Sequence, residues 1–204
     1  MGEAQVSEKG LDSNVVIRSL RLIFWGALLC VLSFKINGFD VFDDTVGLLL
    51  ICLGVFPLAK QPGGTHHKNF MLFVQTVAII TLIKQVMFGY FSPPESLSLI
   101  LQILGLLMLA GIVVFCLAMR DMAEIHNLSI SKNSWKTTLV LFVAIYVIPL
   151  GLFYLYALWA IISGSTFNFN IKSLWAIPII AIFFVPIIHL FVSTSRMKKE
   201  MLTV

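Results

Sequence analysis

The chain has 204 residues, of which 59% are hydrophobic and 12% are charged, and its formal net charge at pH 7 is +4. Soluble domains are about 45–50% apolar, so this composition excludes an ordinary soluble fold and indicates a protein whose main solvent is lipid. A membrane-spanning helix needs about 20 apolar residues. The chain therefore has room for several spans and for no separate soluble domain.

Apolar segments alternate with short polar stretches along the whole chain. We expect an all-α integral membrane bundle of six transmembrane helices, which form a single domain over residues 1–204. The predicted spans cover about residues 15–34, 43–60, 70–91, 97–119, 137–162 and 173–195. No small-residue cleavage site follows the first apolar run, so we expect the first span to be retained rather than removed as a signal peptide.

Two local patterns predict how the first two spans begin and pack. Asp12, Ser13 and Asn14 are good N-cap residues for the first helix, because their side-chain oxygens can accept hydrogen bonds from its free N–H groups. Gly47 and Gly54 are seven residues apart in the second span and so share one helix face. Small residues on one face allow a neighbouring helix to approach closely.

The basic residues predict the orientation of the bundle. With both termini on the cytoplasmic side, most of the 14 lysines and arginines fall at the inner ends of the spans, as the positive-inside rule requires. This arrangement, N-in/C-in, leaves a polar connection over residues 120–136 on the inner side and the acidic loop after the first span on the outer side. The inner basic residues are Lys9, Arg18, Arg21, Lys60, Lys68, Arg120, Lys132, Lys136, Arg196, Lys198 and Lys199.

The loop between the first two spans collects three acids. Asp40, Asp43 and Asp44 follow Lys35 within ten residues. One aspartate can cap the second helix, because a carboxylate is stabilised at the positive end of a helix dipole. Three acids exceed what one cap requires, so a cation or ammonium ligand at the outer face is the alternative. The D-x-D-x-D-G spacing of a calcium loop is absent from this segment.

The same loop carries a sequence resemblance. The run Lys35-Ile-x-x-Phe39-Asp40-x-x-x-Asp44-x-x-Gly47 resembles a pattern in small, mostly uncharacterised multi-pass membrane proteins of Gram-positive bacteria. There, a Pro-Asp pair opens the second helix, whereas this chain has Asp43 in place of that proline. The resemblance covers about 13 residues, implies a bacterial cell-membrane location and implies no activity.

Three polar residues inside predicted spans are candidates for ligand contact. A lysine within a span costs about 2.5–3.5 kcal/mol on insertion scales, so Lys84 needs an acidic partner from the outer loop, an exit to the headgroups, or a ligand. Gln85 and Gln102 lie at a comparable depth in the outer half of the bundle. Hydrogen bonding between helices is the other interpretation of this cluster.

The histidines and cysteines do not indicate a metal or redox site. His66 and His67 are predicted to be surface residues, and His189 to hydrogen-bond to a neighbouring helix. The cysteines lack C-x-x-C spacing and lie in apolar segments, so we expect buried small hydrophobes with no disulfide, zinc or other cofactor. They are Cys30, Cys52 and Cys116.

These patterns lead to two hypotheses for function. In the first, the protein binds a small molecule or ion from the outer face, as a transporter or as the membrane substrate-binding subunit of a transport system, through Asp40, Asp44, Lys84, Gln85 and Gln102. In the second, it is a non-transporting membrane partner of another protein, such as an immunity, sensory or assembly factor. Protease and hydrolase motifs are absent, so we expect no enzyme, and no basic patch indicates nucleic acid. A polar cavity in the outer half would favour the first hypothesis, and a dry, glycine-packed bundle the second.

Overall fold

The computed structural model describes residues 11–31, 35–36, 39–40, 44–91, 95–163 and 173–203, and it is helical apart from one pair of two-residue strands. Residues Lys35 and Ile36 pair with Asp40 and Phe39 in an antiparallel register. The elements in chain order are α1 (Ser13–Val31), β1 (Lys35–Ile36), β2 (Phe39–Asp40), α2 (Asp44–Leu58), α3 (His67–Tyr90), α4 (Glu95–Ile125), α5 (Ser129–Phe142), η1 (Val143–Val147), α6 (Ile148–Ser163) and α7 (Ser173–Met201).

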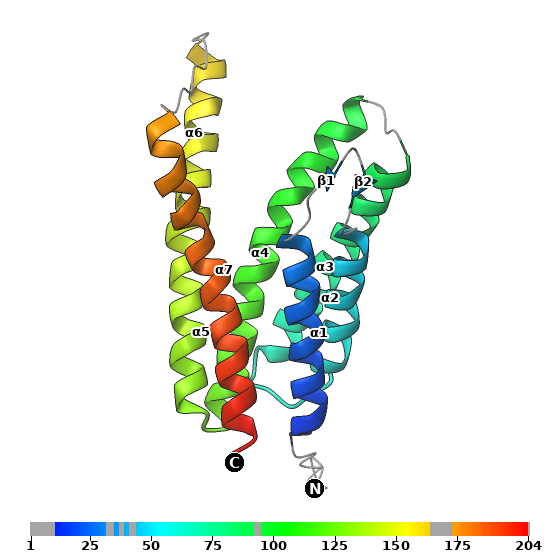
Figure 1. Cartoon of the computed structure of the whole chain (residues 1–204), viewed down its shortest axis with the longest axis vertical. Helices are drawn as coiled ribbons and strands as arrows, with labels where there is room; N and C mark the ends of the chain where they lie inside the picture. Colours follow the sequence, from blue (N-terminus) through cyan, green and yellow to red (C-terminus); the bar gives the residue numbers. More distant parts are fainter. Residues whose placement is uncertain are drawn as a thin grey trace, which may run out of the picture.

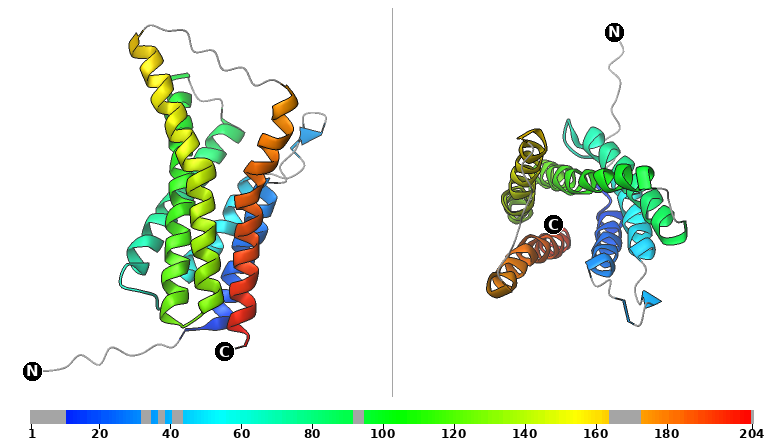
Figure 2. Two further views of the ribbon diagram at one scale, coloured as in Figure 1. Left: turned by 90° about the vertical axis from the view of Figure 1, so that its left-hand side faces the viewer. Right: turned by 90° about the horizontal axis from the view of Figure 1, so that it is seen from above.

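The helices lie roughly along one common axis (Figure 1). Helices α1, α2 and α3 gather on one side of the long helix α4, while α5, α6 and α7 lie on its other side (Figures 1 and 2). The start of α1 and the end of α7 are at the same end of the bundle, which we call the inner end, and the opposite end is called the outer end. The two groups of helices spread apart toward the outer end.

Several helices have the length and composition of membrane spans. Four stretches of the described chain are long and apolar enough to cross a membrane, namely Ser13–Cys30, His67–Met87, Ser129–Phe153 and Ala181–Met201. Helix α2 is apolar but shorter. Many large apolar side chains on these helices are exposed, including Leu53, Leu72 and Ile188. A surface of this kind is suited to lipid, since large exposed apolar patches are rare on soluble monomers.

Asp12 caps α1, as the sequence predicts. Its Oδ1 accepts hydrogen bonds from the backbone N–H groups of Asn14 and Val15, each at 3.1 Å. Its own backbone N–H donates to the side-chain Oε1 of Gln61 at 3.1 Å. The cap therefore also ties the start of α1 to the turn that follows α2.

Glycines bring α1 and α2 together, which confirms the prediction from Gly47 and Gly54. A Cβ atom built on Gly47 would lie 2.7 Å from the backbone oxygen of Gly26, and one on Gly54 would lie 2.7 Å from the backbone oxygen of Ser19. Real Cβ atoms do not come so close to a carbonyl oxygen. Only residues without a Cβ allow the two backbones to approach this closely.

Helices α4 and α5 replace most of the polar connection that the sequence predicts over residues 120–136. Helix α4 continues to Ile125 and α5 begins at Ser129. Asn127 has a positive φ of 55°, and the N–H groups of Leu128 and Asn127 donate to the carbonyls of Ala123 and Glu124 at 2.8 and 3.2 Å. This is the Schellman pattern, in which one left-handed residue ends a helix and satisfies its last carbonyls.

Helices α5 and α6 are joined through a turn of π-helix, η1. Pro149 follows this turn by two residues. Proline has no N–H group to donate and its ring clashes with the carbonyl four residues earlier, and a π-bulge relieves both problems by adding one residue to the turn. The π-helical turn contains Tyr146, whose hydroxyl donates to the backbone oxygen of Phe183 in α7.

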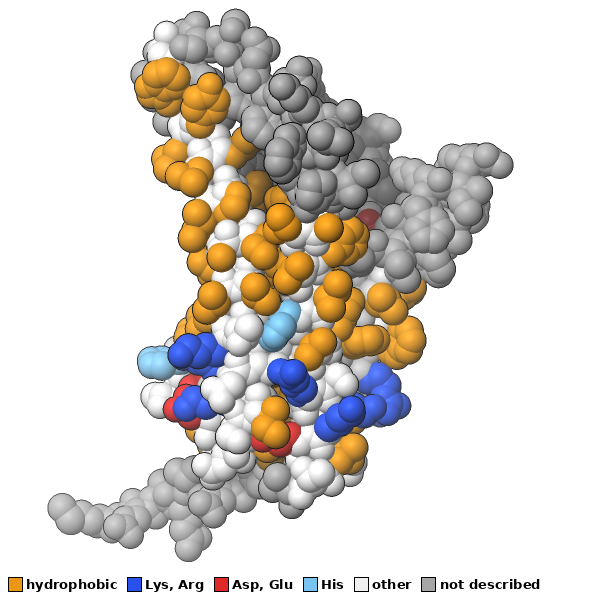
Figure 3. All heavy atoms as spheres, turned by 60° about the vertical axis from the view of Figure 1, so that its left-hand side comes forward, with side chains coloured by type: hydrophobic (Ala, Val, Ile, Leu, Met, Phe, Trp, Pro, Cys, Tyr) orange, Lys and Arg blue, Asp and Glu red, His pale blue; other side chains and the backbone are white. Residues whose placement is uncertain are grey.

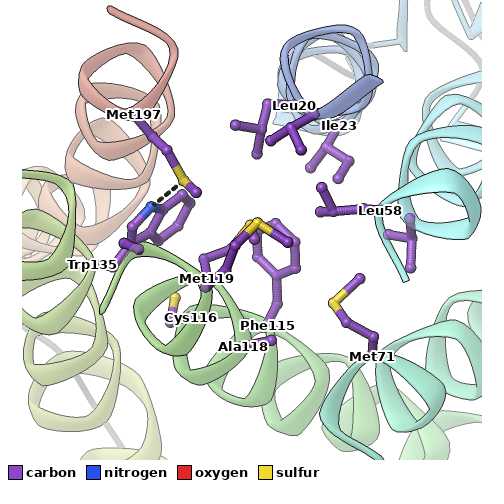
Figure 4. Close-up of a cluster of buried hydrophobic side chains, with 14 of the residues drawn as sticks. Leu20, Ile23, Leu58, Met71, Phe115, Cys116, Ala118, Met119, Trp135 and Met197 are labelled. Carbon is purple, nitrogen blue, oxygen red and sulfur yellow. Dashed lines mark hydrogen bonds between the residues drawn. The ribbon is translucent and has the colours of Figure 1, made fainter. Parts of the chain in front are cut away.

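The packed core lies in the inner half of the bundle, where α1, α2, α3, α4, α5 and α7 meet. Trp135 is fully buried, contacts the ring of Phe115 edge-on with centroids 5.6 Å apart, and donates from Nε1 to the sulfur of Met197 at 3.1 Å (Figure 4). Leu20, Leu58, Met71 and Met119 belong to the same cluster. Flexible methionine side chains fill the irregular spaces between helices of different direction.

Lysine and arginine side chains gather near the inner end, below a band of apolar side chains (Figure 3). In the part of the chain that the structure describes, they come from the first turns of α1, from the connection between α2 and α3 and the first turn of α3, and from the adjoining ends of α4, α5 and α7. This distribution is the one that the positive-inside rule associates with a cytoplasmic face.

Candidate functional site

A cavity of about 420 Å³ lies between the two groups of helices, toward the outer side of the packed core. Helices α1, α2, α3 and α4 supply most of its lining, and α5, η1 and α7 complete it. Phe115 lines this cavity and also contacts Trp135, so the core closes the cavity on its inner side. The volume is within the range of about 300–1,000 Å³ that is typical of small-molecule sites.

The described lining of the cavity is almost entirely aliphatic and aromatic. Thr81 and Tyr146 carry hydroxyl groups on this lining, but both hydroxyls already donate hydrogen bonds. The Thr81 Oγ1 donates to the backbone oxygen of Val77 at 2.8 Å, and the Tyr146 hydroxyl donates to that of Phe183. The arrangement therefore suits an apolar group better than a polar solute or a bare ion.

Three of the lining residues are small. Ala27 of α1, Ala78 of α3 and Gly111 of α4 all contribute to the lining. Gly111 lies so close to α3 that a Cβ at this position would be 2.8 Å from a methyl carbon of Val77. The signal in the sequence is weak, because small residues in membrane helices more often indicate close packing.

Two of the lining faces continue outward to charged or polar residues. On α3 the lining residues Val74, Ala78 and Thr81 are followed on the same face by Gln85, four residues beyond Thr81. Lys84 lies at the edge of that face, near the direction of Val77, because successive residues are about 100° apart around a helix. Lys84 and Gln85 are both half-buried.

Helix α2 continues in the same way. Leu48, Ile51 and Val55 line the cavity, and Asp44 precedes Leu48 by one turn on the same face. Asp44 is half-buried at the first turn of α2, and its backbone oxygen lies 3.9 Å from the Cys30 sulfur, which also lines the cavity. We call Asp44, Lys84 and Gln85 the rim of the cavity.

Three of the five predicted site residues, Asp44, Lys84 and Gln85, therefore follow lining residues outward along α2 and α3, and none of the three is itself part of the described lining. Asp40 lies in β2 and Gln102 in α4, but their side chains fall outside the part that the structure describes. Asp43 lies outside the described residues altogether. The involvement of all five in ligand binding stays a prediction.

No ion pair between Lys84 and Asp44 is observed among the residues that the structure describes. Among the residues that the structure describes, the one ion pair joins Lys132 and Glu124 at the inner end, with 2.7 Å between Nζ and Oε1. The hydrogen bond from Lys132, together with its positive charge, lowers the pKa of the Glu124 carboxyl. Pairing of Lys84 with Asp40 or Asp43 stays a prediction.

A chain of hydroxyl groups joins α5 to α7 below the cavity. The Thr138 Oγ1 lies 2.8 Å from His189 Nδ1 and 2.7 Å from Ser193 Oγ, and the latter is 2.7 Å from Ser134 Oγ. The prediction that His189 hydrogen-bonds to a neighbouring helix is confirmed. Such contacts fix the register of two helices in lipid, where polar groups have few other partners.

The prediction of a surface location is wrong for His67 and confirmed for His66. His67 is only 2% exposed, and its Nδ1 donates to the backbone oxygen of Ala118 at 3.2 Å. Gly63 packs directly against the imidazole ring, and this contact explains the burial: the turn before α3 folds back over its first residue. His66 is exposed.

The predicted burial of the cysteines is confirmed for Cys52 and Cys116 and only partly met by Cys30. Cys52 and Cys116 are buried, Cys30 is half-buried, and all three are free thiols. No group of three or more histidine, cysteine or acidic side chains that could hold a metal ion occurs within the described ranges.

The tertiary structure also identifies a residue that the sequence did not single out for a site. Tyr146 lies on the cavity lining and at the contact between η1 and α7. The sequence feature that could have indicated Tyr146 is Pro149, which marks the irregular turn that contains this tyrosine.

Comparison of the chain with protein-family models, with curated proteins and with solved structures finds no match.

Proposed function

We propose that this protein is a membrane-embedded binding protein that takes a small apolar or amphipathic molecule from the bilayer into the cavity between its helices. The observation that carries this proposal is the cavity itself, with its apolar lining and internally satisfied hydroxyl groups. Lipid chains surround such a bundle at high concentration. A ligand that partitions into the bilayer therefore reaches the cavity without first being dehydrated at the protein.

The proposal includes a multi-pass topology with six spans, both termini on the cytoplasmic side and a location in a bacterial cell membrane. Two observations support it: the described ends of α1 and α7 lie at one end of the bundle, and basic residues gather there. The helix α4 has 31 residues, and at about 1.5 Å per residue it is longer than the 30 Å hydrocarbon core.

The proposal changes the ligand class of our first hypothesis. A polar cavity would have favoured a hydrophilic substrate or an ion, whereas the described lining favours an apolar body. The inner side of the cavity is closed by the core around Phe115 and Trp135, an arrangement that suits a binding protein or the substrate-binding subunit of a transport system. We propose no enzymatic activity.

The close contact of α1 and α2 favours a second candidate, a non-transporting partner protein. Glycines bring the backbones of these two helices close together, and the exposed side of α2 presents Val46, Leu49, Leu53 and Phe56. In this alternative, that apolar face contacts another membrane protein instead of lipid. Stoichiometric co-purification of another chain that is lost when Leu49 and Leu53 are changed to alanine would support it.

The buried Trp135 offers a direct test of cavity binding. It is 0% exposed and contacts Phe115, which lines the cavity. Trp25 and Trp159, in contrast, are 52% and 57% exposed. In a variant that keeps Trp135 and carries phenylalanine at Trp25, Trp159 and Trp175, we expect phosphatidylcholine brominated along its acyl chain to quench the fluorescence of Trp135. Bromine quenches only at short range, so quenching reports an acyl chain near Phe115.

A variant with a filled cavity distinguishes quenching of Trp135 by a bound acyl chain from quenching by the surrounding lipid. Ala27→Leu with Ala78→Leu adds volume inside the cavity, and we expect it to reduce the quenching of Trp135. Ile79→Phe is the matched control, because Ile79 is 40% exposed on α3 and does not line the cavity. Equal quenching in the blocked variant, the control and the parent protein would refute binding in the cavity.

A further inference from the structure

The rim of the cavity carries charged and polar residues, in contrast to the apolar lining. The lining between α1, α2, α3 and α4 is mostly apolar and ends on α3 at Thr81, and Lys84 and Gln85 follow one turn farther outward, beyond the lining residues. Lys84 is three residues beyond Thr81, so its Cα is about 4.5 Å farther along the helix axis. A lysine stem can follow apolar surface and bring its ammonium group to the outer edge of the cavity.

The charge of Lys84 is not balanced by an ion pair among the described residues. The other described lysines and arginines, apart from Lys35 in β1, belong to the inner end of the bundle. An ammonium group that is half-buried and close to lipid favours a nearby anion, because few water molecules are available to screen it.

Gln85 adds directed hydrogen bonding at the same place. Its position falls on the middle of the α3 face that lines the cavity, as the spacing from Val74, Ala78 and Thr81 shows. A glutamine amide carries two N–H donors and one acceptor. The two positions are about 100° apart around α3, so a headgroup at the rim would lie between them. An ammonium group and an amide both suit the oxygen atoms of a phosphate, sulfonate or carboxylate.

We propose that the cavity binds a membrane lipid or lipid-derived amphiphile whose acyl chain occupies the apolar lining and whose anionic headgroup contacts Lys84 and Gln85. This inference rests on the proposed function, and it adds the headgroup charge and the residues that recognise it. The source of the ligand is the outer part of the bilayer, because the rim lies on the outer side of the cavity.

Asp44 is the opposing charge that this assignment has to accommodate. It lies at the first turn of α2, the helix that packs beside α3. The positive end of the α2 dipole offsets part of the Asp44 charge. We therefore expect Asp44 to limit the headgroup to one side of the rim and to disfavour ligands with a second negative charge there.

The test uses brominated amphiphiles that share one alkyl chain and differ in headgroup. The chain with Trp135 as its single tryptophan is titrated in uncharged maltoside micelles with an alkyl sulfonate, an alkyl alcohol or an alkyl trimethylammonium. We expect quenching by all chains that enter the cavity, with the sulfonate binding at least about tenfold tighter than the alcohol, in line with a charge-assisted hydrogen bond. The trimethylammonium should bind least tightly.

Variants of the rim residues test whether Lys84 causes the preference for an anionic headgroup. Lys84→Met should remove the preference for the sulfonate over the alcohol, and Lys84→Arg should keep it. Lys68→Met is the matched control, since Lys68 is on the same helix at the inner end and is exposed. Asp44→Asn should tighten sulfonate binding, because it removes a nearby negative charge.

The outcomes separate the two proposals. If all three amphiphiles quench Trp135 with equal affinity, the headgroup assignment is overturned while the cavity remains a binding site. If no amphiphile quenches in a cavity-dependent way, the proposed function itself is overturned. The comparison within the parent protein needs no rim variant, so poor folding of Lys84→Met would leave the test intact, and Lys84→Gln supplies a second variant of similar length.

Discussion

Glu200 in α7 caps the first turn of α5 through Ser131. Its Oε2 accepts hydrogen bonds from the backbone N–H of Ser131 at 2.8 Å and from the Ser131 hydroxyl at 2.5 Å. Its Oε1 accepts from the N–H of Ile130 at 3.1 Å. A carboxylate from one helix thus satisfies the free donors of another, and its negative charge lies at the positive end of the α5 dipole.

This relationship predicts the effect of removing the charge. Glu200→Gln should destabilise the inner contact of α5 and α7 by about 0.5–2 kcal/mol, the range found for the loss of a helix cap. The measurement is the free energy of unfolding in detergent, followed by the fluorescence of Trp135, which lies in the same contact. Glu124→Gln is the control and should have the smaller effect, because the Glu124–Lys132 pair is exposed.

The hydroxyl chain predicts energetic coupling between α5 and α7. Ser134 and Ser193 are buried and their oxygens are 2.7 Å apart. In a double-mutant cycle with Ser134→Ala and Ser193→Ala, we expect a coupling energy of about 0.6 kcal/mol, the average for hydrogen bonds between membrane helices. Strictly additive losses would show that the two hydroxyl groups pack together without a net hydrogen-bond contribution.

Alanine substitution should have opposite effects at Gly54, which lies in the contact between α1 and α2, and at Gly151, which does not. Gly54→Ala should destabilise the protein by about 1–3 kcal/mol, because the new methyl group meets the Ser19 carbonyl and the helices must separate. Gly151→Ala is the matched control, since nothing lies within 4 Å of a Cβ at that position in α6. Alanine there should be neutral or stabilising by up to about 1 kcal/mol. Similar losses at both positions would contradict the close packing.

The proposed orientation predicts which connections are accessible from outside the cell. A cysteine introduced at Ser165 should react with a membrane-impermeant thiol reagent in intact cells, whereas one at Thr65 should react only after the cells are opened. The three native thiols are buried or half-buried, so their background should be low. Labelling at Thr65 alone in intact cells would reverse the orientation and move the rim of the cavity to the cytoplasmic side.

The sequence by itself determined the features that depend on neighbouring residues. Its apolar segments predict helices, and the structure has a helix in each of the six predicted spans. Asp12 predicts the start of α1, and Gly47 and Gly54 predict the close face of α2. Each of these follows from helix periodicity or from local hydrogen bonding, which act over a few residues.

Only the tertiary structure decided which residues meet. The contact of Glu200 with Ser131 joins positions 69 residues apart, and the burial of His67 depends on the turn that covers its ring. The cavity likewise is lined by residues from helices that are far apart in the sequence, such as Ala27 of α1, Ala78 of α3 and Gly111 of α4. These outcomes depend on the rotation and the register of whole helices, and the period of a single helix leaves both undetermined, because an apolar face packs equally well against lipid or against another apolar face.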